Sequence, residues 1–248
     1  METINYKGYE ITTEQDYDAP NPRIDMDNLF TFIGMHRRYA SPDEMNQEST
    51  RNLIVDIANF YDNDFTENET KKAFAWVKAN LIFYPVYLEE HDVLSFGFSK
   101  GDPWDSGLFG ALFVTKEKAL KEYSAKRLTK KILDNLEGVA RAELKAYEDY
   151  ANGFIYSVSL SRNGVYVDST GGIDSDSVSE IIEEMKAIAD SNIEERKAAS
   201  LSVLKEMLAK NEPLEKIRDA VVQAFNEEPK QVYYTYSQDA GGYVAVEK

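Results

Sequence analysis

The sequence has no cysteine, only two histidines among its 248 residues, and no apolar run near the roughly 20 residues that span a bilayer. Without cysteine, disulfides and Cys-ligated zinc or iron–sulfur centres are excluded. Residues 1 to 15 also lack the pattern of a signal peptide. These absences predict a cytoplasmic protein that does not engage a membrane and that carries no metal and no cofactor.

Basic residues are fewer than acidic residues in this sequence. The chain has 44 acidic and 28 basic residues, which gives a net charge of −16. An acidic protein repels nucleic acid at long range, so direct nucleic-acid binding is not expected. The one basic stretch, Lys116 to Lys131, is typical of a solvated helix face. The acidity favours either plain solubility or a partner protein with a basic surface.

Common catalytic motifs are missing as well. The chain contains no GxxxxGK[ST] or GxGxxG phosphate loop, no HExxH zinc motif and no complete EF-hand loop, and Asp105-Ser106-Gly107 does not match a GxSxG nucleophile elbow. The remaining candidates for catalysis are His36, His91, Asp102 and Asp105. Two imidazoles and two carboxylates would hold a divalent cation and activate a water for phosphodiester or ester hydrolysis. Because their spacing matches no ligand motif, a metal-assisted hydrolase is the alternative hypothesis, and enzymatic activity is not the expected one.

The chain does contain alternating strand and helix signals, which predict the α+β class, with a mostly antiparallel sheet of five or six strands packed by helices. Asn163-Gly164 lies between two strand-like runs and predicts a hairpin. Thr115 is suited to begin a helix and Asn152-Gly153 to end one. The predicted elements are a strand at 6–12, helices at 53–60 and 67–81, strands at 82–88, 93–98 and 108–114, helices after 115 and at 127–152, and strands at 154–160 and 165–168.

The stretch from Ser169 to Gly172 resembles a turn, and the periodicity changes from two to 3.6 just beyond it. We therefore expect an α+β core over residues 1–172 and an acidic region over residues 173–248, either folding alone or docked on the core. The pattern of the second region predicts three short amphipathic helices, with apolar stripes at 178–185, 201–208 and 214–225. A hairpin around Ala240-Gly241 would close it.

Several segments occur in a specific order and spacing. They are His36-Arg37-Arg38-Tyr39, Tyr84 to Leu88, Pro103-Trp104-Asp105-Ser106-Gly107, Val114 to Lys118, and Glu143 to Tyr150. In these segments the chain resembles a family of uncharacterised bacteriophage and prophage proteins, over about residues 16 to 172. The resemblance implies a phage origin and a small accessory protein acting in the host cytoplasm, but no activity. Asp102 stands where similar sequences have a cysteine, which weakens an enzymatic interpretation of the loop.

Arg37 and Arg38 are candidate binding residues. Two adjacent guanidinium groups beside a histidine and a tyrosine can bind a phosphate or an acidic partner. The alternative is that one of them pairs with a nearby aspartate and holds the N-terminal loop. The aspartates considered are Asp25, Asp27 and Asp43.

Further binding candidates are Trp104 and the glutamates Glu183, Glu184, Glu194 and Glu195. Trp104 is expected to anchor its loop against the core, with an exposed, ligand-contacting tryptophan as the alternative. The glutamates exceed what helix dipoles need, and they favour an acidic surface for a basic partner. The favoured hypothesis is a phage accessory protein that inhibits or modulates a host protein, for example an anti-defence protein that imitates DNA. A structural or assembly role in the virion is a further alternative to the hydrolase.

Overall fold

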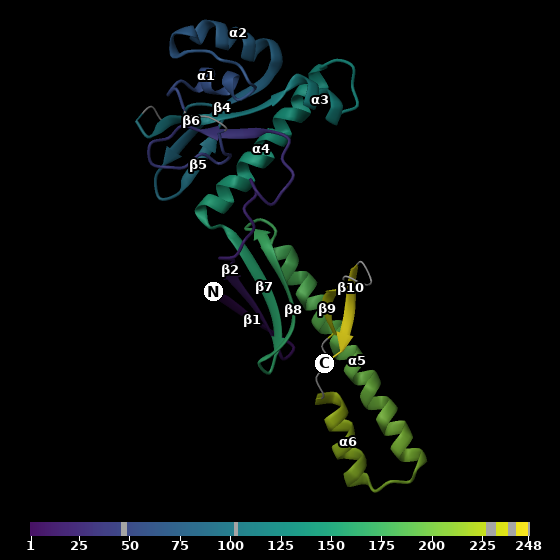
Figure 1. Ribbon diagram of the computed structural model, residues 1–248. Helices are drawn as coiled ribbons and strands as arrows, with labels where there is room; N and C mark the ends of the chain where they lie inside the picture. Colours follow the sequence, from purple (N-terminus) through teal and green to yellow (C-terminus); the bar gives the residue numbers. More distant parts are fainter. Residues whose placement is uncertain (46–48, 102–103, 227–231, 238–241, 248) are drawn as a thin grey trace. The chain divides into compact units, whose positions relative to one another are not determined.

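The computed structural model describes residues 1–45, 49–101, 104–226, 232–237 and 242–247 (Figure 1). It divides into two compact units, a central unit of residues 17–154 and a terminal unit of residues 1–16 and 155–248. Each unit contains one four-stranded antiparallel sheet, and helices accompany both. The α+β class is therefore confirmed, whereas the prediction of one sheet with five or six strands was wrong.

The sheet of the central unit has the strand order β3-β6-β4-β5. These strands are β3 (Thr31–Gly34), β6 (Ser106–Thr115), β4 (Leu81–Glu90) and β5 (Leu94–Gly97). The inner strands β4 and β6 are almost continuously apolar, as expected for strands that are buried on both faces. The predicted hairpin of β4 and β5 is confirmed by their antiparallel pairing.

Helices cover both faces of this sheet (Figure 1). One face packs against α1 (Leu53–Asn59) and α2 (Thr70–Asn80), which follows a short 3₁₀ turn, η1 (Glu67–Glu69). The other packs against α3 (Lys116–Glu122) and α4 (Lys130–Asn152). Neighbouring residues of one strand serve opposite layers, because successive side chains alternate between faces. Thus Phe32 joins the α4 layer, and Ile33 joins the α1–α2 layer.

The middle of β6 carries a local irregularity and a very close backbone contact. Its pairing with β4 shifts register between Val86 and Tyr87, which sets Phe109 outside the ladder. The ring of Phe109 lies 5.6 Å from Phe32 and joins the α4 layer. A Cβ atom at Gly110 would lie 1.9 Å from the carbonyl oxygen of Ile33 on β3. Only glycine permits this approach of the two strands.

Two predicted helix ends are confirmed. The Thr115 side chain accepts a hydrogen bond from the Lys118 backbone N–H and begins α3. Gly153 adopts the left-handed conformation, with φ of 70°, and ends α4. The start of α4 lies at Lys130 and not at Arg127, because Thr129 caps the helix there.

The sheet of the terminal unit has the order β1-β2-β7-β8. Its strands are β1 (Glu2–Tyr6), β2 (Tyr9–Gln15), β7 (Ile155–Arg162) and β8 (Val165–Asp174). The single strand expected at 6–12 was wrong, because Lys7 and Gly8, with φ of 49° and 86°, form a tight turn there. The hairpin at Asn163-Gly164 is confirmed, and both residues have positive φ as this turn requires.

One face of this second sheet is covered by α5 (Val178–Ala209). Ile11, Val158 and Leu160 pack against Met185 of the helix, as part of a single core cluster. The strands alternate apolar with polar residues, and the side chains between these positions on β2 and β7 are not buried.

The chain leaves this sheet after β2 and returns to it with β7, the neighbouring strand. Gln15 pairs with Tyr156, and the Asp16 backbone N–H donates to the Ile155 carbonyl at 2.8 Å. The expected boundary after residue 172 falls inside β8, because the stretch from Ser169 to Gly172 is strand and not a turn. The boundaries between the two compact units instead lie between residues 16 and 17 and between residues 154 and 155.

The acidic region contains two helices before its terminal strands, not the three that were expected. The 32-residue α5 is continuous through both of the first two predicted stripes, and α6 (Leu214–Asn226) follows it. The terminal strands β9 (Val232–Ser237) and β10 (Gly242–Glu247) pair antiparallel, which confirms the hairpin. Its expected turn at Ala240-Gly241 lies outside the described residues. In the described part of the chain, no helix combines the length and apolar composition that crossing a membrane requires.

Candidate functional site

The loop before β6 does not bury its tryptophan. Trp104 is 93% exposed, so the prediction that it anchors the loop against the core was wrong. It lies in a turn ahead of the first paired residue, Ser106, which is buried and whose Oγ accepts a hydrogen bond from the Gly101 N–H at 3.2 Å. Ser106, and not Trp104, therefore connects this loop to the start of β6. Asp102 and Pro103 lie outside the described residues.

The two histidines have different surroundings. His91, in the turn between β4 and β5, has its Nε2 3.5 Å from Glu89 and 3.9 Å from Oδ2 of Asp105. The ring of His36 stacks on Tyr39 at 5.1 Å. Within the described residues, no three histidine or carboxylate side chains lie close enough together to hold a metal ion. The structure thus brings His91 and Asp105 together, but it adds no further support to the hydrolase hypothesis.

Arg38 and Tyr39 bind the last residue of β4. Both side chains contact the carboxylate of Glu90, Arg38 through an ion pair and Tyr39 through a 2.8 Å hydrogen bond from its hydroxyl. This hydrogen bond raises the pKa of Tyr39, because the carboxylate stabilises the protonated phenol. Arg37 is exposed, and in the described part of the chain it forms no ion pair. The expected pairing of Arg37 or Arg38 with an aspartate of the N-terminal loop was therefore wrong.

Arg23, which the sequence did not single out, forms the most buried ion-pair network of the described residues. Its side chain is 1% exposed. Its Nε and Nη2 donate to the two carboxylate oxygens of Asp43 at 2.8 and 2.6 Å, and Nη1 donates to Glu143 of α4 at 3.0 Å. Nη1 and Nη2 also donate to Asn28 Oδ1 and to the Phe30 carbonyl, both at 2.8 Å.

The carboxylates around Arg23 are occupied by backbone groups as well. Glu143 accepts from the N–H groups of Leu29 and Phe30, and Asp43 accepts from that of Phe32. Burial alone would lower the pKa of Arg23, but the paired carboxylates outweigh it and raise the pKa. The network fastens the N-terminal loop to the core, so its role is structural. The sequence contains one signal for this role, because Arg23 is the only lysine or arginine between Lys7 and Arg37 and is surrounded by acidic residues.

A hollow of about 380 Å³ lies beside this network. Its wall includes Lys118, whose ammonium group donates to the carbonyls of Asn28 and Leu29 at 3.2 and 2.7 Å. Because the ammonium group of Lys118 is already bound to backbone oxygens, it is not available to anchor an anionic ligand in the hollow.

The predicted glutamates lie together on the solvent side of α5. The helix buries Met185, Ala189 and Arg196 on the side that faces its own unit. At 3.6 residues per turn, five acids fall within about one third of the circumference on the opposite side. They are Glu180, Glu183, Glu184, Glu194 and Glu195, all exposed, and we call them the acidic face of α5.

Lysines one turn away pair with part of this face. Glu183 accepts from Lys186 and Glu194 from Lys197, both at 2.7 Å. Glu184 and Glu195 form no ion pair among the described residues. Their separation of eleven residues corresponds to about 16 Å along the helix. The arrangement is a stripe of negative charge on a rigid element.

Two further acids of this region have structural roles. Asp190, outside the acidic face, binds the ammonium group of Lys7 at 2.7 Å, and this hydrogen bond lowers the pKa of Asp190. Asp174 accepts hydrogen bonds from the N–H groups of Asp176 and Ser177, at the start of α5. These two carboxylates are engaged within the fold, whereas the acidic face is directed to solvent.

Comparison with known proteins found no family model, no curated protein and no solved structure that matches this chain.

Proposed function

We propose that the protein acts by binding a basic surface of another protein through the acidic face of α5. The observation that carries this proposal is the position of Glu180, Glu183, Glu184, Glu194 and Glu195 on one exposed side of a continuous helix. A helix that packs on a sheet along its opposite side holds these charges in fixed relative positions. Fixed charges of one sign accelerate encounter with a complementary surface and disfavour partners of the same sign.

The resemblance to phage proteins supports a bacterial host protein as the partner, and inhibition or modulation as the outcome. A basic surface is common on proteins that handle nucleic acid, since they must neutralise phosphates. A helix with a stripe of carboxylates would compete with nucleic acid for such a surface, as a DNA mimic does. The net charge of −16 extends this attraction beyond the contact itself.

The proposal is tested by reversing four charges on the acidic face. The variant E183K/E184K/E194K/E195K keeps good helix formers at every position, so α5 should remain intact, as circular dichroism can verify. We expect this variant to lose the host proteins that the wild-type chain retains from bacterial lysate at low salt. Quantitative mass spectrometry of the retained proteins, repeated at high salt, provides the measurement.

A matched control separates the acidic face from net charge. The variant E2K/E14K/E44K/D92K makes four reversals at exposed acids that are not part of α5 and changes the net charge by the same amount. It should retain the same host proteins as the wild-type chain. If the two variants lose the same proteins, or neither loses any, the acidic face of α5 is not the binding surface.

A further inference from the structure

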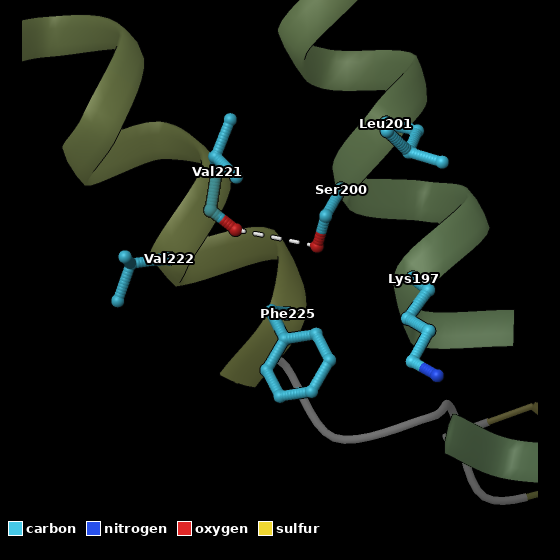
Figure 2. A pocket seen from close by; sticks show the side chains of 6 residues that line it. All are labelled: Lys197, Ser200, Leu201, Val221, Val222 and Phe225. Carbon is cyan, nitrogen blue, oxygen red and sulfur yellow. Dashed lines mark hydrogen bonds between the residues drawn. The ribbon is translucent and has the colours of Figure 1, made fainter. Parts of the chain in front are cut away.

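A second surface of the terminal unit differs from the acidic face in kind. Beyond the sheet, α5 packs against α6 and leaves an open groove of about 440 Å³ between the two helices (Figure 2). Lys197 and Leu201 of α5 and Val222 and Phe225 of α6 line the groove (Figure 2). Below them, the Ser200 hydroxyl donates to the Val221 carbonyl at 3.3 Å. Apart from the lysine, the groove is apolar.

The apolar surface continues beyond the groove. Leu201, Leu208, Leu214 and Val222 are each more than half exposed, although all lie on amphipathic helices. Ile217 is the single residue of α6 that is buried. Two paired helices shield each other on one side only, so their outer side is left as an apolar strip. We call the segment 196–226, which contains both helix stretches, the α5–α6 hairpin.

Charge distinguishes the α5–α6 hairpin from the rest of the chain. It contains six basic and four acidic residues, a net charge of +2 within a chain of −16. Several of these charges neutralise one another in short-range pairs. The pairs are Lys210–Glu206 at 2.5 Å, Lys216–Glu212 at 3.8 Å and Arg218–Asp219 at 2.8 Å. The hairpin is therefore close to neutral, so it repels a second copy of this protein less than the acidic segments of the chain do.

We propose that the α5–α6 hairpin packs against the same hairpin of a second copy, which yields an antiparallel four-helix arrangement. A two-fold interface places a surface against itself, so it requires apolar groups and charges of mixed sign. The hairpin meets both requirements, and the acidic face of α5 meets neither. A surface that selects a different protein by its charge would instead carry charges of a single sign around its apolar part. The two helices already form half of a four-helix bundle, whose remaining half is an identical hairpin.

The size of the contact sets its strength. Thirteen residues of α6 span about 20 Å, and two helices side by side are about 20 Å wide. This gives about 400 Å² in projection, below the roughly 800 Å² per partner of a stable interface. We therefore expect a reversible dimer with a dissociation constant in the micromolar range. Lys197 of the groove pairs with Glu194, so the groove adjoins the acidic face of α5, but the dimer is argued from apolar contact and does not depend on the proposed function.

Sedimentation velocity of the full chain tests this dimer. Over about 1 to 500 µM, the mass should rise from the monomer value of 28.2 kDa toward twice that value. The variant L201E/V222E, which places carboxylates at exposed groove positions, should raise the dissociation constant at least about tenfold. The variant L133E/V165E adds the same charges at exposed apolar positions outside the hairpin and should dimerise like the wild-type chain.

Salt provides an independent readout. Screening weakens the repulsion between two acidic chains but leaves apolar contacts in place, so added salt should strengthen this dimer. A dimer in which the acidic face of one copy binds basic residues of the other would weaken with added salt instead. A wild-type chain that stays monomeric throughout the range, or that dimerises equally well with L201E/V222E, would overturn the proposal. Helical circular dichroism of each variant shows whether its fold is retained.

Discussion

The two compact units contain sheets of equal strand number that are covered to different extents. In the central unit, α1 and α2 cover one face and α4 covers the other, so the sheet separates two hydrophobic clusters. In the terminal unit, α5 covers one face, and a single cluster holds helix and sheet together. The central unit is thus built around a fully buried sheet, and the terminal unit around a sheet that is buried on one side.

The difference follows from the sequence pattern of the strands. The central strand β4 begins Leu-Ile-Phe-Tyr-Pro-Val-Tyr-Leu, whereas β7 reads Ile-Tyr-Ser-Val-Ser-Leu-Ser-Arg. Continuous apolar runs require cover on both faces, and strict alternation requires it on one. The ion pairs named above also differ, because the Arg23 network of the central unit is buried whereas the Lys7–Asp190 pair of the terminal unit is exposed.

The largest effect is expected from Arg23→Ala in the central unit. It leaves the carboxylates of Asp43 and Glu143, 20% and 11% exposed, without their cation. Breaking a buried pair in this way costs about 3–5 kcal/mol. Both tryptophans lie in the central unit, so urea unfolding followed by tryptophan fluorescence reports on this unit selectively.

The matched control is Lys72→Ala on α2 of the same unit, whose surface pair with Glu69 should contribute under about 1 kcal/mol. A cost below about 1 kcal/mol for Arg23→Ala would show that burial of this network is not what stabilises the central unit.

An intermediate effect is expected from Gly110→Ala at the close contact of β3 and β6. The added Cβ meets backbone, which cannot move aside as a flexible side chain can, so we expect a loss of about 1–3 kcal/mol or more. Gly107 lies in the same strand with nothing within 4 Å of an added Cβ. Gly107→Ala should therefore change stability by less than about 0.5 kcal/mol. Equal effects of the two substitutions, measured by urea unfolding, would contradict the tight layering of the central sheet.

The smallest effect concerns the exposed pair of Asp190 and Lys7 in the terminal unit. The hydrogen bond from Lys7 lowers the pKa of Asp190 below its ordinary value of 3.8. The stabilisation is therefore present above that value and is lost as the pH falls through the lowered pKa of the folded state. Asp190→Asn should flatten the acid limb of the terminal unit's stability, measured by thermal unfolding from pH 2 to 7, relative to Glu2→Gln. An unchanged acid limb would show that this pair contributes nothing to the terminal unit.

Local signals predicted local structure well. The expected hairpin turn forms at Asn163-Gly164, and the expected helix caps form at Thr115 and Gly153. Such turns and caps are predictable because their conformations depend on a few neighbouring residues. The turn at Lys7-Gly8 was missed, since the residues around it are compatible with one continuous strand. Trp104 was expected to pack on the core because a strand follows it immediately, and its exposure shows how weak that argument is at a loop.

The length of α5 could not be predicted from its apolar pattern, for a physical reason. Its first half packs on the sheet through Met185 and Ala189, and its second half packs on α6 through Ser200. At 3.6 residues per turn, the apolar stripe at 201–208 lies about one third of the circumference away from the stripe at 178–185, so the pattern resembles two helices. The carboxylates of the acidic face were predicted from charge crowding, but their common side required knowledge that the helix is continuous. The Arg23 network joins residues up to 120 positions apart, which no local pattern encodes.

The pairing of β2 with β7 also determines the order in which the protein can fold during synthesis. Residues 17–154 emerge from the ribosome between these two strands. A lone hairpin of β1 and β2 is marginal in water, so the first sixteen residues must wait for β7 and α5 before they gain a lasting partner. The central unit has its complete sequence by then and can fold first. The amino terminus, although made first, is therefore among the last parts of the chain to become native.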